Sequence, residues 1–166
     1  MKDLTPGELM VYQVDRALED RLAPTVKAIL GNQFFTKSLW ADEREGTDFL
    51  VLSSERIRVA VRLRRHGFRE PFGQQFTIRW SRPSGVPTEI HKILAGLVDY
   101  FLYGFVDAQE QKITQYFIGD LKVFRLHEPQ PVKMIVNPSL DSTFGVFDHS
   151  DMAPGFVIKV WPSDRA

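Results

Sequence analysis

A strict alternation of apolar and mostly basic side chains over residues 57–64 constrains the fold more than any other stretch of the chain. Two sets of residues alternate there: Ile57, Val59, Val61 and Leu63 in one, and Arg58, Ala60, Arg62 and Arg64 in the other. A period of two with branched apolar residues on one face is typical of a half-buried strand. With the residues before a polar turn at 53–55, the pattern predicts an antiparallel hairpin over residues 47–65 in the centre of a sheet.

The basic face of this strand belongs to a segment of concentrated positive charge. Nine Lys or Arg residues and two acids lie between Arg56 and Lys92, so the segment carries +7 in a chain whose formal net charge is zero. Such asymmetry predicts an anionic partner, DNA or RNA. A planar guanidinium can bind two phosphate oxygens at once, and the candidates for this role are Arg58, Arg62, Arg64 and Arg79. The alternative is that acids of the first helix fold over the segment.

The first predicted element is a helix. Thr5 can cap it and Pro6 suits its first position. Pro24 predicts a kink or a split, because proline lacks the main-chain N–H and clashes with the preceding turn. Gly31 predicts the end of the helix, and a first strand is expected within residues 32–39.

The segments after the basic strand alternate between strand and helix patterns. Residues 75–80 predict a strand with Arg79 on its polar face, which would form one patch with the arginines of residues 57–64 if the strands were neighbours. Residues 88–103 predict a helix whose apolar stripe packs across the sheet and which Gly104 ends. Strands are also expected at 113–118, 132–136 and 156–161, and a strand or short helix at 120–126.

The size of the chain suits one domain spanning residues 1–166. The core is expected at about 5–126, and a strand-rich tail over about 127–166 is expected to wrap it. The chain has no cysteine, which excludes disulfides and thiolate metal sites and is compatible with the cytoplasmic location that we expect. No apolar run reaches the roughly 18 residues of a membrane span.

The order of these elements resembles the restriction-endonuclease-like fold of the PD-(D/E)XK nuclease superfamily, over about residues 9–126. In that family an aspartate on one strand and an acid-x-lysine triplet on the next converge on a divalent metal. Asp48 matches the first acid, whereas Arg62-Leu63-Arg64 stands at the triplet and departs from the pattern. Arginine stays protonated and cannot serve as a base. The resemblance implies a three-layer α/β domain with a mixed central sheet.

The resemblance also implies a hydrolase that cleaves phosphodiester bonds with Mg²⁺ or Mn²⁺ and without an organic cofactor. The implied metal ligands are Asp48, Glu19 and Glu89, and Lys92 joins Asp48 and Glu89 as a catalytic candidate. The alternative function, which the missing second acid favours, is a non-catalytic nuclease relative or an interaction module. In that case the acids and arginines form an internal ion-pair network.

Overall fold

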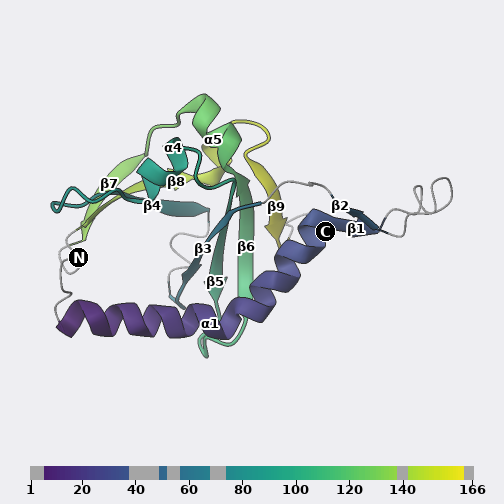
Figure 1. Ribbon diagram of the computed structural model, residues 1–166, viewed down its shortest axis with the longest axis horizontal. Helices are drawn as coiled ribbons and strands as arrows, with labels where there is room; N and C mark the ends of the chain where they lie inside the picture. Colours follow the sequence, from purple (N-terminus) through teal and green to yellow (C-terminus); the bar gives the residue numbers. More distant parts are fainter. Residues whose placement is uncertain (1–5, 38–48, 52–56, 68–73, 138–141, 163–166) are drawn as a thin grey trace.

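The computed structural model describes residues 6–37, 49–51, 57–67, 74–137 and 142–162, and it arranges them in three layers. A four-stranded mixed sheet forms the middle layer. A long helix packs on one of its faces, and a three-stranded sheet with two short helices covers the other (Figure 1). The chain is therefore a mixed α/β protein with a mixed central sheet.

The four-stranded sheet has the order β3-β5-β6-β9, so β3 lies at its edge. β3 (Val59–Arg64) pairs in parallel with β5 (Tyr100–Val106), and β5 pairs antiparallel with β6 (Ile113–Asp120). β9 (Val157–Trp161) completes the sheet antiparallel to β6.

The hairpin predicted over residues 47–65 is wrong. β2 (Phe49–Val51) pairs with β1 (Phe35–Lys37) in a separate two-stranded sheet, and β3 has β5 as its partner. The predicted turn at 53–55 lies outside the described residues. Alternation fixes which side chains share a face of a strand, but it leaves the partner strand open. The two faces are as predicted: Val59, Val61 and Leu63 pack toward the long helix, and Ala60 packs toward the three-stranded sheet.

The three-stranded sheet is antiparallel with the order β4-β8-β7. β4 (Gln75–Ser81) matches the predicted strand, whereas β8 (Ser142–Asp148) lies in a segment for which no strand was predicted. β7 is Lys133–Asn137. The part of the chain that was expected to wrap the core thus supplies β7 and β8 to one sheet and β9 to the other.

The helix predicted over residues 88–103 is wrong beyond its first turns. α4 (Glu89–Leu94) is short, Gly96 follows it with φ +68°, and the chain then enters β5. Residues 101–106 are buried on both faces of the sheet, so their side chains do not alternate between apolar and polar. A continuous apolar run of this kind does not distinguish a buried strand from a buried helix in the sequence. Asp120 caps the second short helix, α5 (Leu121–His127), by accepting hydrogen bonds from the main-chain N–H groups of Lys122 and Val123.

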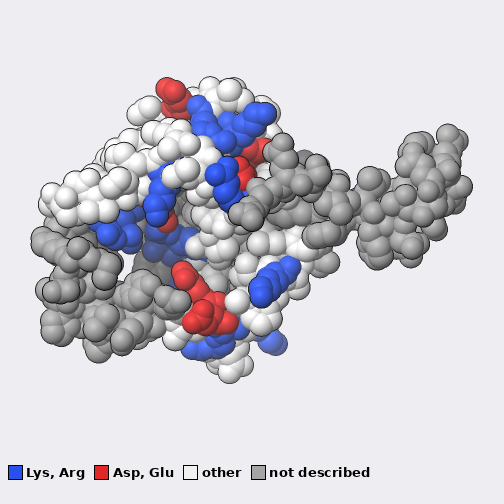
Figure 2. All heavy atoms as spheres, viewed as in Figure 1, with Lys and Arg blue, Asp and Glu red and all other residues white. Residues whose placement is uncertain are grey.

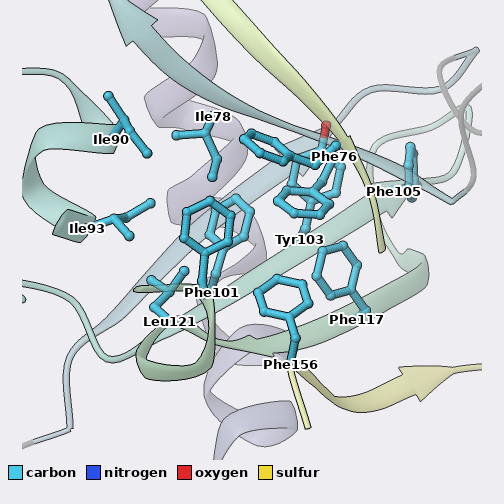
Figure 3. Packing of buried hydrophobic residues seen from close by; sticks show 12 residues of the cluster. Phe76, Ile78, Ile90, Ile93, Phe101, Tyr103, Phe105, Phe117, Leu121 and Phe156 are labelled. Atoms are coloured by element: carbon cyan, nitrogen blue, oxygen red, sulfur yellow. The ribbon is translucent and has the colours of Figure 1, made fainter. Parts of the chain in front are cut away.

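The main core lies between the two larger sheets and is rich in aromatic rings (Figure 3). Phe76 on β4 contacts the rings of Phe117 on β6 and Phe147 on β8, each with ring centroids 5.3 Å apart. Phe156 stacks on Phe76 with a centroid distance of 5.6 Å. Ile90 and Ile93 join this core from α4, which ties the helix to the edge of both sheets.

A second core lies between the four-stranded sheet and α1 (Pro6–Phe34). Leu18, Leu22 and Val26 are buried against the sheet. Pro24 lies inside the helix, which changes direction partway along its length (Figure 1). Gly31 does not end it, because the helix continues to Phe34 and takes up the first residues of the predicted 32–39 strand. Within the described residues no helix has the length and apolar character needed to cross a membrane.

Candidate anion-binding site

Four of the predicted site residues lie together where the edges of the two larger sheets approach each other. Arg62 and Arg64 project from β3, Arg79 projects from β4, and Glu89 begins α4. The predicted arginine patch therefore forms, but not on one sheet. β3 and β4 belong to different sheets, and their side chains meet between them. Figure 2 shows Lys and Arg side chains gathered beside β3 and β4, with an acidic side chain among them.

Glu89 links the two sheets. One carboxylate oxygen accepts a hydrogen bond from the Arg62 guanidinium, which also forms a salt bridge with it. The other oxygen accepts the main-chain N–H of Arg79 at 2.8 Å. Thr88, the residue before it, is buried and donates its hydroxyl to the carbonyl oxygen of Trp80 at 2.8 Å. These bonds fix the start of α4 against β4 and aim Glu89 at β3.

Arg64 is held by two hydroxyl groups. Its Nε donates to the Tyr103 hydroxyl at 2.6 Å, and one of its terminal nitrogens donates to the hydroxyl of Thr77 on β4. The guanidinium carbon also lies 5.7 Å from the centre of the Tyr103 ring. These contacts set the direction of the guanidinium, and an arginine held in this way loses little further conformational entropy when it binds a ligand.

Phe144 on β8 forms an apolar base for two of the guanidiniums. The Cζ atoms of Arg62 and Arg79 lie 5.6 and 5.4 Å from the centre of its ring. Both distances are within the range of a cation–π contact. One phenyl ring thus holds two like charges close together, which costs electrostatic energy unless an anion lies nearby.

Arg79 occupies an electrostatically unfavourable position. Burial lowers the pKa of its guanidinium, and the charges of Arg62, Arg82 and Arg64 lower it further, while Glu89 raises it. Its Nε is buried and makes no hydrogen bond. A buried charged donor without a partner is costly, and such groups are rare in native proteins. The site therefore has unused donor capacity and an excess of positive charge.

The remaining predicted residues lie elsewhere. Arg58 is bonded to Asp99 and to the carbonyl oxygen of Gly96, and Lys92 is exposed on α4. Glu19 is exposed on α1, on the opposite side of the four-stranded sheet from Glu89. Asp48 lies outside the described residues.

The structure does not bring the described members of the implied metal set together. Both oxygens of Glu89 accept hydrogen bonds from donors on Arg62 and Arg79, and Glu19 lies across the sheet. In the ranges that the structure describes, no three His, Cys, Asp or Glu side chains form a group that could hold a metal ion. Magnesium and manganese prefer several oxygen ligands, whereas this site offers mainly guanidinium donors.

Three contributors to the site were missed from the sequence: Phe144, Tyr103 and Arg82. Phe144 lies on the unpredicted strand β8, and Tyr103 stands at the end of the segment read as a helix. Their aromatic character alone gave no signal, since the core of the described residues is itself rich in aromatic rings. Arg82 was counted in the basic segment but was not singled out.

Comparisons of the chain with models of protein families, with curated proteins and with solved structures gave no match.

Proposed function

We propose that the protein binds nucleic acid by holding phosphate in the arginine site, which we define as Arg62, Arg64 and Arg79. The observation that carries the proposal is the buried Nε of Arg79, which lacks a hydrogen-bond partner beside two other guanidiniums. A phosphate oxygen would accept from this donor and offset the charge that the cluster concentrates. The +7 segment around the site would add longer-range attraction for a polyanion.

Binding without hydrolysis is the form of the proposal that the described residues support. Glu89 already joins Arg62 to β4, so its carboxylate acts in the proposal as a positioning group. The metal-dependent nuclease activity would need Asp48 and further oxygen ligands that the described residues do not bring to Glu89. A restriction-endonuclease-like assignment within the mixed α/β class, and a cytoplasmic location, belong to the same proposal.

A second candidate is an interaction module whose charges serve only its own fold. The observation that favours it is the number of arginines already paired with acids in the described chain. Arg62 pairs with Glu89, Arg58 with Asp99 at 2.9 Å, and Arg65 with Glu110 at 2.6 Å. In this candidate the arginine site closes the gap between the sheets and binds no ligand.

Titration of fluorescently labelled single- and double-stranded oligonucleotides at low salt separates the two candidates. We expect binding that weakens steeply as salt rises, because phosphate contacts release counterions. Arg79→Ala should lower the affinity about tenfold or more, the effect of losing a charged hydrogen bond of about 1.5–3 kcal/mol, and reduce the salt slope by about one.

Lys122→Ala provides a matched control, because it removes one positive charge from an exposed position on α5. It should leave the affinity within about twofold, since a distant surface charge is largely screened. Equal losses of affinity in the two variants would show that binding depends on net charge and not on the arginine site. No binding to either strand form by the wild type would favour the interaction module.

A further inference from the structure

We infer that the arginine site takes the terminal phosphate of a nucleic-acid strand, a phosphate monoester, in preference to the diesters along the strand. The inference rests on the proposed function and specifies the part of the polymer that the site recognises. Three properties of the site lead to it: its guanidiniums gather at one place, they are partly buried, and their charge suits a dianion.

The guanidiniums gather at one place between the two sheets. Arg62 and Arg79 come from different sheets, yet both guanidinium carbons lie within 5.6 Å of the centre of the Phe144 ring. Arg64 is directed between the same strands by its bond to Thr77 on β4. A protein that binds along a strand places its cations in a row that follows the backbone. Clustering of this kind suits a single phosphate group.

The donors are also recessed from solvent. Only 14% of the Arg62 side chain is exposed, and the Nε of Arg79 is buried. An internal diester carries a nucleoside on each side and has only two free oxygens to present. A terminal phosphate has three and carries a nucleoside on one side only, so it needs less room than an internal diester to approach donors that are partly buried.

The charge of the site matches a dianion. Even without Arg64, three positively charged guanidiniums, those of Arg62, Arg79 and Arg82, are offset by the single negative charge of Glu89. A phosphate monoester carries about −1.5 to −2 at pH 7, whereas each internal diester carries a single negative charge. The lowered pKa of Arg79 has burial as its largest cause and, after burial, this excess of positive charge. A monoester offsets it more completely than a diester does.

The test compares three oligonucleotides of one sequence, carrying a 5′-phosphate, a 3′-phosphate or no terminal phosphate, with the label placed internally. Fluorescence anisotropy measures their affinities for the wild type, Arg79→Ala, Arg79→Lys and Lys122→Ala. We expect one phosphorylated end to bind at least tenfold more tightly than the unphosphorylated strand. The preference should fall to within about twofold in Arg79→Ala and persist in Lys122→Ala.

Two further measurements test whether the preference comes from the arginine site and from the charge of the terminal phosphate. Arg79→Lys keeps the charge but removes the planar fork, so we expect it to lose most of the preference while circular dichroism shows a native fold. The preference of the wild type should also shrink as the pH falls below about 6, where a monoester loses its second charge.

The outcomes that contradict the inference differ from those that contradict the proposed function. Equal affinities for the three oligonucleotides, all reduced by Arg79→Ala, would overturn the terminal-phosphate inference and leave nucleic-acid binding intact. An end preference that persists in Arg79→Ala would place the recognition elsewhere and overturn it too. Inorganic phosphate that binds in calorimetry as tightly as the phosphorylated strand would show that the strand contributes nothing, which overturns both. Failure of all three strands to bind would also overturn both.

Discussion

Arg58 and Asp99 form a two-pronged ion pair beside the first paired residues of β3 and β5. The Nε of Arg58 donates to one carboxylate oxygen of Asp99 at 3.0 Å, and a terminal nitrogen donates to the other at 2.9 Å. The main-chain N–H of Arg58 adds a bond of 2.8 Å to the same carboxylate. The Arg58 carbonyl oxygen accepts from the main-chain N–H groups of Asp99 and Tyr100. The pair thus contributes to the parallel register of the two strands.

This pair predicts a pH dependence of stability. The hydrogen bond from the Arg58 side chain, and after it other contacts of the same arginine, lower the pKa of Asp99. A carboxylate whose pKa is lower in the folded state stabilises the fold above its unfolded pKa of about 3.9, and this stabilisation is lost as the pH falls through the folded-state value. Asp99→Asn should therefore unfold more easily than the wild type at pH 7, and the difference should narrow below about pH 4.

Denaturant melts from pH 7 to pH 3 would measure this difference. Asp151→Asn, at an exposed position in the 3-10 turn His149–Asp151, is the control for losing one surface carboxylate. A gap between the wild type and Asp99→Asn that stays constant across this range would contradict the prediction.

Glu89→Gln should have opposite effects on stability and on binding. The change removes the charge that faces the half-buried Arg62 guanidinium, so we expect the free energy of unfolding to fall by about 1–2 kcal/mol. It also removes a negative charge from the arginine site, so the affinity for an oligonucleotide should rise severalfold. Parallel melts and anisotropy titrations would test both expectations. An unchanged or lower affinity in a folded variant would contradict the expectation that the Glu89 charge opposes the binding of an anion.

Gly119→Ala should destabilise the core through a close contact with Phe156. A Cβ atom at position 119 would lie 2.7 Å from the Cζ atom of the Phe156 ring, which is 1% exposed and cannot move outward freely. Overpacking of this kind costs about 1–3 kcal/mol. The control is Gly31→Ala, where a Cβ would meet nothing within 4 Å and the residue lies inside α1. It should stabilise by about 0.5–1 kcal/mol, and chemical denaturation of both variants would reveal the contrast in sign.

A pair of leucine variants tests the assignment of α4 and α5. Leu121 at the start of α5 is fully buried, so Leu121→Ala should cost about 2–5 kcal/mol. Leu94 at the end of α4 is 54% exposed, and Leu94→Ala should change the stability by less than about 0.5 kcal/mol. Similar losses for the two variants in urea melts would indicate that residues 88–103 bury a continuous helical stripe after all.

The sequence predicted the faces of the strands better than their partners. Alternation over residues 57–64 correctly separated the side chains that pack toward α1 from the arginines on the other face. It could not select β5 as the neighbour, because the pairing joins residues about forty positions apart and depends on contacts such as Leu63 against Gly104. The run from Phe101 to Val106 lacks a period because both faces of β5 are covered.

The candidate site was predicted to a similar extent. Arg62, Arg64 and Arg79 were selected from their charge and the strand pattern, and Glu89 was selected as an acid that the family resemblance implied. The structure brings the four together. Phe144 was beyond the reach of that argument, because its place under two guanidiniums arises from the pairing of β4 with β8. A sequence pattern reports which residues share one strand, whereas this site lies between strands of two sheets.

The late position of Phe156 and β9 in the chain has a consequence for synthesis. β5 and β6 leave the ribosome well before β8, Phe156 and β9, which cover the aromatic face that carries Phe101 and Phe117. At about 5–20 residues per second, the roughly forty residues after β6 take several seconds to be added. During that interval the nascent chain exposes apolar aromatic surface, which is prone to aggregation. We therefore expect the amount of chaperone in the host to limit how much folded protein is recovered.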